Sequence, residues 1–572
     1  MLPGCGATFL LHDAREPVPD RLNSPNPALV TQRAAQRLPR IALLLFCAAY
    51  VLPGLFGRDP WKNADIAAFG HMIGIAHGRT PWLAPSIAGV PADGALLPYW
   101  LGAGAIRLFE PLVGAPQAAR LPFALLLVLV LVLTWYATYH LARTEAAQPL
   151  PFAFGGEASP IDYARAIADG AVLALMATLG LLQLGHETTP ELVQLTGAAL
   201  FLYALAASPF RIWPARLAVV VALCTLAASG APSVGLALAA VAAVICARSS
   251  YAPVRHLVPW IVGAAVLAAL AAAALGAWGW RVGGMRSIGA QVRLLFWFTW
   301  PAWPLALWTL WRWRSHWLHR HISVPLGGVL VPLVAGWVMG GSDRALMLAL
   351  PALAVLAAFA LPTLKRSTAA AIDWFSVFFF TTCAIVIWVV YAAMQTGWPA
   401  KPAANVARLA PGFVSRFSLF ALVIALLATF AWLWLVQWRA GRNRHPLWKS
   451  LVLPAGGVAL CWLLLMTLWL PLLDYARSYR PMMRLVAQHV PHDSCVSAPG
   501  ASRALLAALE YLGRYTVEAT RSSAATGCNY LLQPDFPAGS AQAGPGWELV
   551  GRVQRPTDRE DFVAIYRRAK KP

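Results

Sequence analysis

The feature that most constrains this chain is a series of long apolar stretches that carry almost no charge. Residues 123–134, for example, read FALLLVLVLVLT inside a longer apolar segment. A helix of about 20 apolar residues crosses the roughly 30 Å hydrocarbon layer of a bilayer. Hydrophobic residues make up 59% of the chain and charged residues 12%, whereas soluble proteins carry roughly 25% charged residues. The sequence therefore predicts an all-α polytopic membrane protein.

Thirteen segments have the length and hydropathy of membrane-spanning helices, with boundaries that are soft by several residues. We place them at 40–57, 118–141, 163–183, 191–208, 213–230, 232–248, 256–278, 291–311, 322–340, 344–363, 374–394, 416–437 and 450–472. The loops after even-numbered spans are rich in Arg, as in 312–320 (RWRSHWLHR) and 439–449 (RAGRNRHPLWK), whereas the opposite loops near 184–190 and 341–343 are nearly uncharged. Because Arg-rich loops remain in the cytoplasm, we predict a multi-pass protein of the bacterial inner membrane with a cytoplasmic N-terminus and a periplasmic C-terminus.

The two ends of the chain differ from its apolar middle. The first 20 residues (MLPGCGATFLLHDAREPVPD) lack the charged start, apolar core and cleavage site of a signal peptide. We interpret them as a disordered part of a cytoplasmic N-terminal tail that covers 1–39. From about residue 474 the sequence becomes charged and mixed. We therefore expect a transmembrane domain over 40–473, which includes a periplasmic loop at 58–117, and a small periplasmic α+β domain over 474–572.

Short patterns indicate the elements of this last domain. The runs 528–533 (CNYLLQ) and 561–568 (DFVAIYRR) alternate like strands, and 501–512 is expected to be a helix. The domain holds Cys495 and Cys528, whereas the other six cysteines lie in spans or in the N-terminal tail. Because the periplasm is oxidising, we expect a disulfide between these two cysteines.

The predicted periplasmic loop 58–117 is too long to serve only as a connection. Its segment 99–112 (YWLGAGAIRLFEPL) is apolar but short, and Arg107 and Glu110 interrupt it. This pattern is typical of an amphipathic helix that lies in the membrane interface.

Acidic residues next to the predicted outer face are few, and they gather beside this interfacial helix. They and their polar neighbours are Asp59, Asp65, Asp93, Glu110, His186, Glu187, Glu191 and the adjacent Asp343 and Arg344. Any single one of these charged residues needs no functional explanation, because a charge solvated at the membrane boundary costs little free energy. Together on one face, they lie where an enzyme with a lipid-linked substrate would place a base.

Several segments, in this order, resemble one known family. Residues 57–73 (GRDPWKNADIAAFGHMI), 86–103 (SIAGVPADGALLPYWLGA) and 118–125 (AARLPFAL) resemble the first outer loop of membrane glycosyltransferases with the GT-C fold. These form the protein mannosyltransferase and lipid A aminoarabinose transferase superfamily, which is glycosyltransferase family 39-like. Similarity to that family also extends to the turn from His186 to Glu191 and to three later segments, 343–359, 470–482 and 551–568.

The resemblance implies a glycosyltransferase that takes a sugar from an undecaprenyl-phosphate-linked donor on the periplasmic side. The acceptor would be lipid A, another lipid or glycan, or a protein. By the same resemblance, Asp65 and Asp93 are the candidate catalytic carboxylates, because a carboxylate can accept or orient the acceptor proton. The residues that would bind donor phosphate or substrate are Arg58, Arg281, Arg286, Arg344, His186 and Glu191.

The chain departs from the family pattern at three places. The family has Asp-Glu where this chain reads Ala64–Asp65, and Glu-Lys-Pro where it reads Asp93–Gly94–Ala95. The segment 229–235 (SGAPSVG) lacks the Lys that many members carry before Gly-Pro. One acid and two cations are therefore missing, and a non-catalytic relative that binds lipid-linked sugar is an alternative function.

Other functions have less support in the sequence. A lipid or sugar transporter is a third possible function, because Pro and Gly occur inside the predicted spans. No internal repeat of the kind found in many transporters is evident. The net charge of +21 lies in short loops and favours contact with anionic membrane lipids over nucleic acid. No phosphate-cradling Gly-rich loop, HExxH or paired CxxC motif occurs, and the sequence leaves a requirement for a divalent cation open.

Overall fold

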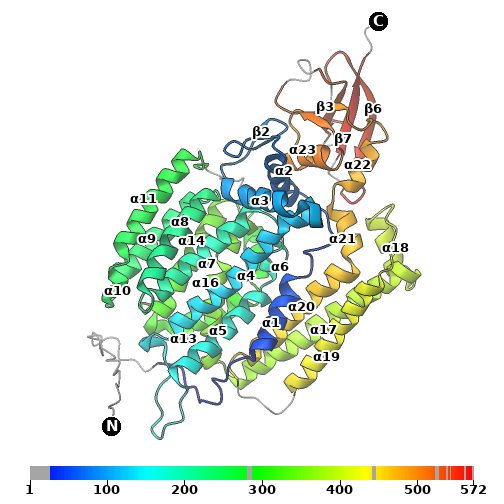
Figure 1. Ribbon diagram of the computed structural model, residues 1–572. Coiled ribbons are helices and arrows are strands. Elements are labelled where there is room, and N and C mark those ends of the chain that lie inside the picture. Colours follow the sequence, from blue (N-terminus) through cyan, green and yellow to red (C-terminus); the bar gives the residue numbers. More distant parts are fainter. Residues whose placement is uncertain are drawn as a thin grey trace, which may run out of the picture.

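The computed structural model describes residues 26–279, 287–440, 446–521, 527–535, 539–541, 543–558 and 562–569. Helices form a large bundle, and a small domain with a β-sheet sits on one end of it (Figure 1). We call this end of the bundle the domain end and the opposite end the far end. The architecture confirms the predicted fold class, an all-α polytopic membrane protein with a small C-terminal α+β domain.

Each of the thirteen predicted spans contains helix. Within the described ranges, seven helical segments are long and apolar enough to cross a membrane by themselves. They comprise α4 (Ala115–Ala142), α7 (Pro190–Ala207), α10 and α11 (Ala252–Arg255 and Val258–Ala274), α14 (Arg320–Val338), α17 (Arg366–Thr396), α19 (Leu419–Ala440) and α20 (Lys449–Leu468). A short helix, α18 (Ala400–Leu409), joins α17 to α19.

The other predicted spans are shorter or interrupted. They are α1 (Arg40–Val51), α5 and α6 (Pro160–Ala177 and Leu179–Leu184), α8 (Ile212–Ala228), α9 (Pro232–Ala247), α12 and α13 (Ile288–Phe298 and Ala302–Arg312), and α15 and α16 (Asp343–Met347 and Leu350–Ala358). Pro301 separates α12 from α13 because proline has no N–H for the helical ladder.

The first helix ends at Val51, well before the predicted residue 57. Pro53 follows, and Gly54 and Gly57 have φ values of +82° and +75°, which glycine adopts without a steric cost. A Cβ on Gly54 would lie 3.1 Å from the Met466 sulfur of α20. The turn thus packs closely on α20 and brings the following residues to the domain end.

The loop 58–117 is folded. It contains α2 (Ala64–Ala76), a hairpin of β1 (Ser86–Ile87) and β2 (Val90–Pro91), and α3 (Leu96–Val113). The helix expected at 99–112 is α3, which buries Tyr99 and Ile106 and exposes Leu108 and Leu112. The sequence did not predict α2, whose residues are almost all buried.

The C-terminal domain follows α21 (Leu470–Arg477) and α22 (Arg480–Val486). Its elements are β3 (Cys495–Ser497), α23 (Arg503–Tyr511), β4 (Thr516–Glu518), β5 (Tyr530–Pro534), β6 (Trp547–Gln554) and β7 (Phe562–Arg568). The sheet order is β4-β3-β5-β7-β6, with β3 parallel to β4 and β5, and β7 antiparallel to β5 and β6. The expected helix and both expected strands are present, and Cys495 is bonded to Cys528.

Helix α23 packs directly on α2 and so fixes the domain to the bundle (Figure 1). A Cβ on Gly70 of α2 would lie 2.7 Å from the Cβ of Ala507 in α23, so only glycine permits this approach of the two helices. Burial of α2 between the bundle and α23 explains why a short apolar helix is stable there.

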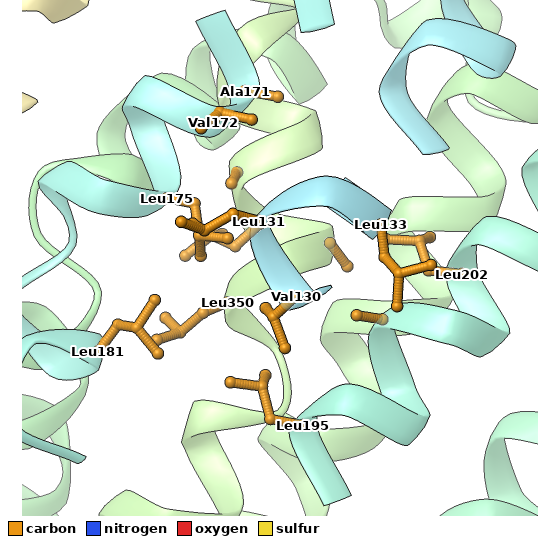
Figure 2. Close-up of a cluster of buried hydrophobic side chains, with 14 of the residues drawn as sticks. Val130, Leu131, Leu133, Ala171, Val172, Leu175, Leu181, Leu195, Leu202 and Leu350 are labelled. Carbon is orange, nitrogen blue, oxygen red and sulfur yellow. The ribbon is translucent and has the colours of Figure 1, made fainter. Parts of the chain in front are cut away.

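The core of the bundle is formed by α4, α5, α7 and α16. Leu131 of α4, Leu175 of α5 and Leu350 of α16 point toward one another, and Leu195 of α7 lies close by (Figure 2). All four are at most 3% exposed. This close packing holds the helix ends that carry the site.

Residues 26–39 of the N-terminal tail are ordered, whereas the segment 1–20, which the sequence predicts to be disordered, lies outside the described residues. Asn26 donates to the carbonyls of Ala146 and Gln148, and Val30 accepts from the backbone N–H of Ala158. Ala28 and Val30 are buried. The segment is ordered because its backbone pairs with the loop between α4 and α5, which periodicity does not reveal.

Candidate functional site

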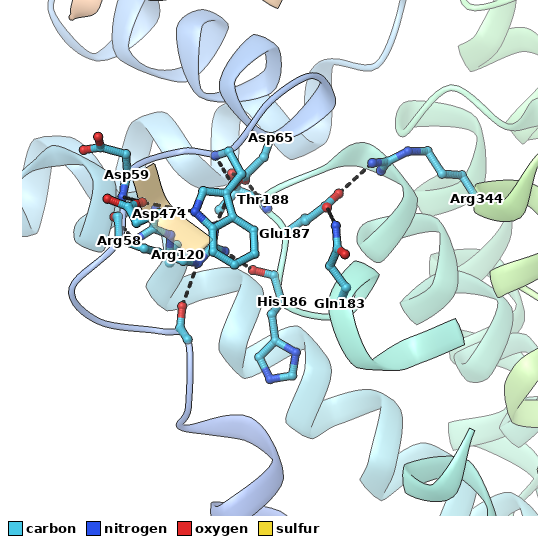
Figure 3. Close-up of polar contacts among 12 residues, drawn as sticks. Arg58, Asp59, Asp65, Arg120, Gln183, His186, Glu187, Thr188, Arg344 and Asp474 are labelled. Carbon is cyan, nitrogen blue, oxygen red and sulfur yellow. Dashed lines mark hydrogen bonds and ion pairs between the residues drawn. The ribbon is translucent and has the colours of Figure 1, made fainter. Parts of the chain in front are cut away.

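An ionised carboxylate with four donors lies at the centre of the domain end. Asp65, in the first turn of α2, accepts at Oδ2 from Arg58 Nη1 (2.9 Å) and from the Trp61 backbone N–H (3.0 Å). At Oδ1 it accepts from the Thr188 N–H (2.8 Å) and hydroxyl (2.6 Å). Asp65 thereby joins the loop after α1 to the loop between α6 and α7 (Figure 3).

The environment keeps Asp65 charged. Burial opposes ionisation, but the charges of Arg58 and Arg120 and the hydrogen bonds from Thr188 outweigh it and lower the pKa of Asp65 to about 2. A carboxyl with so low a pKa is a weak proton acceptor near neutral pH. The geometry therefore suits Asp65 to organise the site and to orient Arg58.

A second buried acid, Glu187, lies beside Asp65, on the loop between α6 and α7 that also carries Thr188. Arg344 Nη2 of α15 donates to Glu187 (2.6 Å), and its Nη1 lies 3.3 Å from Glu191 of α7. Gln183 Nε2 also donates to Glu187 (2.9 Å). In Figure 3, Arg344 reaches the Glu187 carboxylate from the side opposite Arg58 and Asp59.

The pKa of Glu187 is raised above its ordinary value. Burial is the main cause and the negative charge of Asp65 adds to it, while Arg344 and Gln183 act in the opposite direction. A buried carboxyl with a raised pKa exchanges a proton more readily near neutral pH than Asp65 does.

A third polar group joins the C-terminal segment to the first loop. Asp59 accepts from Arg480 at both oxygens (2.8 and 2.5 Å) and from the Ser478 hydroxyl (2.7 Å). Asp474 accepts from the Asp59 N–H and from the Trp61 indole. Burial opposes ionisation of Asp59, yet the bonds from Arg480 and Ser478 lower its pKa. These contacts tie α21 and α22 to the segment that carries Arg58 and Asp65.

Two further arginines contribute positive charge. Arg120 of α4 is buried, and its Nη1 donates to the Arg58 carbonyl (2.9 Å). Arg477, at the end of α21, lies over the Trp61 ring at 5.2 Å, and Arg58 lies over the same ring at 4.5 Å. The Arg477 side chain donates no hydrogen bond to any residue in the described part of the chain.

The pKa of Arg477 is lowered, chiefly by burial and further by the charges of Arg58 and Arg555, although Glu187 opposes the shift. Positive charge is therefore in local excess at this point. An anion placed here would remove part of that electrostatic cost.

The structure brings together some of the residues predicted from the sequence and separates others. Arg58, Asp65, His186, Glu191 and Arg344 all belong to the domain end. Arg281 and Arg286 lie outside the described residues.

Asp93 is placed differently from Asp65. It follows β2, its side chain is 49% exposed, and it forms a 2.6 Å ion pair with Arg503 of α23. Its charge also acts on the buried His71 of α2.

His186 holds its loop in place. Its ring nitrogens lie 2.6 and 2.9 Å from the carbonyls of Leu182 and Tyr50. Its pKa is lowered to about 4, mainly by burial, so the neutral ring donates to one of these carbonyls at a time. The ring points away from Asp65 and Glu187 (Figure 3), whereas the His186 carbonyl accepts from Arg58 Nη2.

The described residues contain no preformed metal site made of protein side chains alone. They contain no group of three or more His, Cys, Asp or Glu side chains that could hold a metal ion. Both oxygens of Asp65 already accept two hydrogen bonds each, and the His186 ring is turned away. We therefore derive no chemical step through a metal.

The sequence did not single out Thr188, Arg120 or Arg477 as site residues. Thr188 follows two candidate residues directly in the chain, and Arg477 lies within the segment 470–482 that resembles the family. Adjacency to these motifs was the available signal. Arg120 lies within the segment 118–125 (AARLPFAL), which also resembles the family, so the same signal was available for it.

Two solved structures are similar to this chain over most of its length. The first is ArnT from Cupriavidus metallidurans bound to undecaprenyl phosphate, which is 13% identical with a TM-score of 0.57 and covers 92% of this chain and 96% of that one. The second is the apo state of the same protein, which is 15% identical with a TM-score of 0.58 and covers 92% and 98%. The chain has the GT-C fold.

Identities this low establish a shared fold alone, and the GT-C fold is the one that the sequence resemblance implied. No protein-family model matches the chain, and no curated protein matches its sequence. The apolar helices and the GT-C fold together make this chain a multi-pass membrane protein.

Proposed function

We propose that this chain is a glycosyltransferase that moves a sugar from an undecaprenyl-phosphate-linked donor to a lipid, glycan or protein acceptor of the bacterial envelope. One observation carries the proposal: the domain end of a GT-C fold holds a buried carboxyl with a raised pKa, Glu187, beside a cluster of arginines. The similar structure that binds undecaprenyl phosphate supports the choice of donor.

In the proposed reaction, an acceptor hydroxyl attacks the anomeric carbon of the donor sugar. The bond between that carbon and the phosphate oxygen breaks, and undecaprenyl phosphate leaves with the electron pair. Glu187 accepts the hydroxyl proton, since its raised pKa suits proton exchange. Asp65 remains ionised, and it orients Arg58 and the loop that carries Glu187.

The leaving phosphate requires positive charge more than it requires an acid. Arg477 is the best candidate, because no carboxylate of the described chain binds its side chain, and Arg58 shares the Trp61 ring with it. The planar guanidinium group suits two phosphate oxygens at once. In this proposal Arg344 positions Glu187 and Glu191 and does not bind the phosphate. Asp93 pairs with Arg503 and takes no part in the reaction.

We further propose that the domain end faces the periplasm and that the far end faces the cytoplasm of a bacterial inner membrane. The far end carries the Arg-rich loops, which supports this orientation. The boundary near residue 474 then separates the transmembrane domain from the periplasmic domain. Fusion of a periplasm-dependent reporter to the C-terminus is expected to give an active reporter, and an inactive one would reverse the orientation.

A non-catalytic relative is the second candidate. Asp65 has no oxygen left for a substrate contact, because it accepts four hydrogen bonds. A chain that only binds lipid-linked sugar would need such a carboxylate for structure alone.

Mass spectrometry of envelope lipids and glycans in a deletion strain tests the proposal. We expect a hexose, pentose or aminosugar mass to be missing, to return with the wild-type gene, and to stay missing with Glu187→Gln. A matched control is Glu157→Gln near the far end, which should restore the mass. An unchanged set of masses in the deletion strain would contradict the transferase function, and restoration by Glu187→Gln would favour the non-catalytic alternative.

A further inference from the structure

The far end of the bundle contains a groove that the proposed reaction does not use. A cavity of about 530 Å³ lies between α1, α4 and α5, three helices that are neighbours at this end (Figure 1). Trp135 lines it and lies 15 residues after Arg120 on α4, which corresponds to about 22 Å along a helix. The groove is therefore separate from the site at the domain end.

The inner part of the groove is apolar and open to lipid. Its walls include Cys47 of α1, Leu131 and Val132 of α4, and Val172 of α5. Val132 and the neighbouring Leu44 are exposed to the surface of the bundle that lipid would cover. Hydrocarbon chains can enter such a groove sideways, without passing through water.

The outer part of the groove is cationic. Arg37 and Arg40, at the start of α1, and Arg165 of α5 line it. Among the described residues, the guanidinium groups of Arg37 and Arg40 have no hydrogen-bond or ion-pair partner. Arg165 lies 3.9 Å from Asp162, which is a weak pair at an exposed position. No side chain of the described residues caps the N-terminus of α1, and the N–H groups of its first turn add positive potential.

Among the described residues that line the groove there is one carboxylate, Asp169, and it helps to hold the wall. Asp169 accepts from the Leu38 N–H (2.8 Å) and from the Trp135 indole (2.8 Å). Trp135 in turn stacks on Tyr139 at 5.3 Å. The lining thus carries three guanidinium groups and one carboxylate, an excess of two positive charges, above an aromatic wall of the kind found at membrane interfaces.

We propose that this groove binds one molecule of anionic glycerophospholipid from the surrounding bilayer. The acyl chains lie along α4 between α1 and α5, and the phosphate lies at the mouth against Arg37 and Arg40. Basic pockets between transmembrane helices bind anionic headgroups in this way. The bulk lipid is the occupant because the groove opens sideways onto the lipid-facing surface at headgroup level.

Native mass spectrometry of the full-length protein in neutral detergent tests the proposal. Dioleoylphosphatidylglycerol is expected to bind at least about 10-fold more tightly than dioleoylphosphatidylcholine. The double variant Arg37→Gln/Arg40→Gln is expected to lose about 10-fold or more in affinity for phosphatidylglycerol, since each cation near a headgroup contributes about 1 kcal/mol, a factor of about 5. Val132→Trp, which fills the groove, should weaken both lipids.

The matched control is Arg248→Gln/Arg255→Gln, which removes two exposed arginines near the far end but outside the groove. This control should keep wild-type affinity, and all variants should keep the wild-type melting temperature. Equal loss in the control and the groove variant, or no preference for phosphatidylglycerol, would overturn the proposal. Displacement of bound phosphatidylglycerol by an equal concentration of undecaprenyl phosphate would also overturn it, because the groove would then belong to the carrier lipid.

Discussion

The Arg344 guanidinium and the Glu187 carboxylate form a 2.6 Å ion pair between residues that lie 157 positions apart in the chain. Glu187 is almost fully buried, whereas the Arg344 side chain is 24% exposed, so the pair lies between the protein interior and the surface. The next residue, Thr188, donates twice to Asp65. The position of the Glu187 carboxylate is therefore coupled to the position of the Asp65 carboxylate through two adjacent backbone units.

Replacement of Glu187 tests its role as the proton acceptor. Glu187→Gln keeps the shape and the bond from Gln183 but cannot accept a proton, and Arg344 retains Glu191 as a partner. We expect sugar transfer in isolated membranes to fall by a factor of about 10² or more, with little change in the amount of folded protein. Unchanged transfer at wild-type protein levels would remove Glu187 from the mechanism.

Replacement of Arg477 tests the proposed phosphate contact. Because this side chain has no carboxylate partner among the described residues, Arg477→Gln should weaken binding of undecaprenyl phosphate about 10-fold without lowering the melting temperature. Titration of purified protein with undecaprenyl phosphate, followed by native mass spectrometry, measures the effect. Arg484→Gln, an exposed arginine on α22, is the control, and equal losses in both variants would indicate a general charge effect.

Acid stability tests the electrostatics of Asp65. Its pKa is about 2 in the folded protein against an ordinary value of 3.8, so its ionised form stabilises the fold above pH 3.8. This stabilisation, about 2 kcal/mol, is lost as the pH falls from 3.8 through 2. Thermal unfolding between pH 6 and pH 2 should therefore depend less on pH in Asp65→Asn than in the wild type.

Glu548→Gln, at an exposed position of β6, is the control for this measurement and should keep the wild-type slope. Parallel curves for wild type and Asp65→Asn would mean that Arg58, Arg120 and Thr188 do not hold the carboxylate as described.

The disulfide of the C-terminal domain gives a prediction on stability. Cys495 and Cys528 are bonded across 33 positions, and a loop of this length corresponds to about 4 kcal/mol of restricted unfolded-state entropy. Cys495→Ser/Cys528→Ser should therefore unfold at a lower temperature and become sensitive to protease after β3. Cys224→Ser in α8 should change neither property, and an unaltered melting temperature in the double variant would contradict the prediction.

The sequence determined the membrane helices, because each one satisfies its own backbone hydrogen bonds in lipid and needs only a local apolar run. Arg-rich loops gave a predicted orientation for the same local reason. The strands β5 and β7 and the helix α23 also followed from short patterns. In contrast, α2 is a short apolar helix that exists because α23 covers it, and residues 26–39 are ordered because a distant loop pairs with them.

The tertiary structure alone decided which charged residues meet. Asp93 and Asp65 looked equivalent in the sequence, yet Asp93 pairs at the surface with Arg503, 410 positions away, and Asp65 is buried with Arg58 and Thr188. Local sequence patterns thus determined the class of protein and indicated the end of the bundle where its polar residues gather. Partners and pKa values within that end depend on contacts between segments far apart in the chain, which no local pattern encodes.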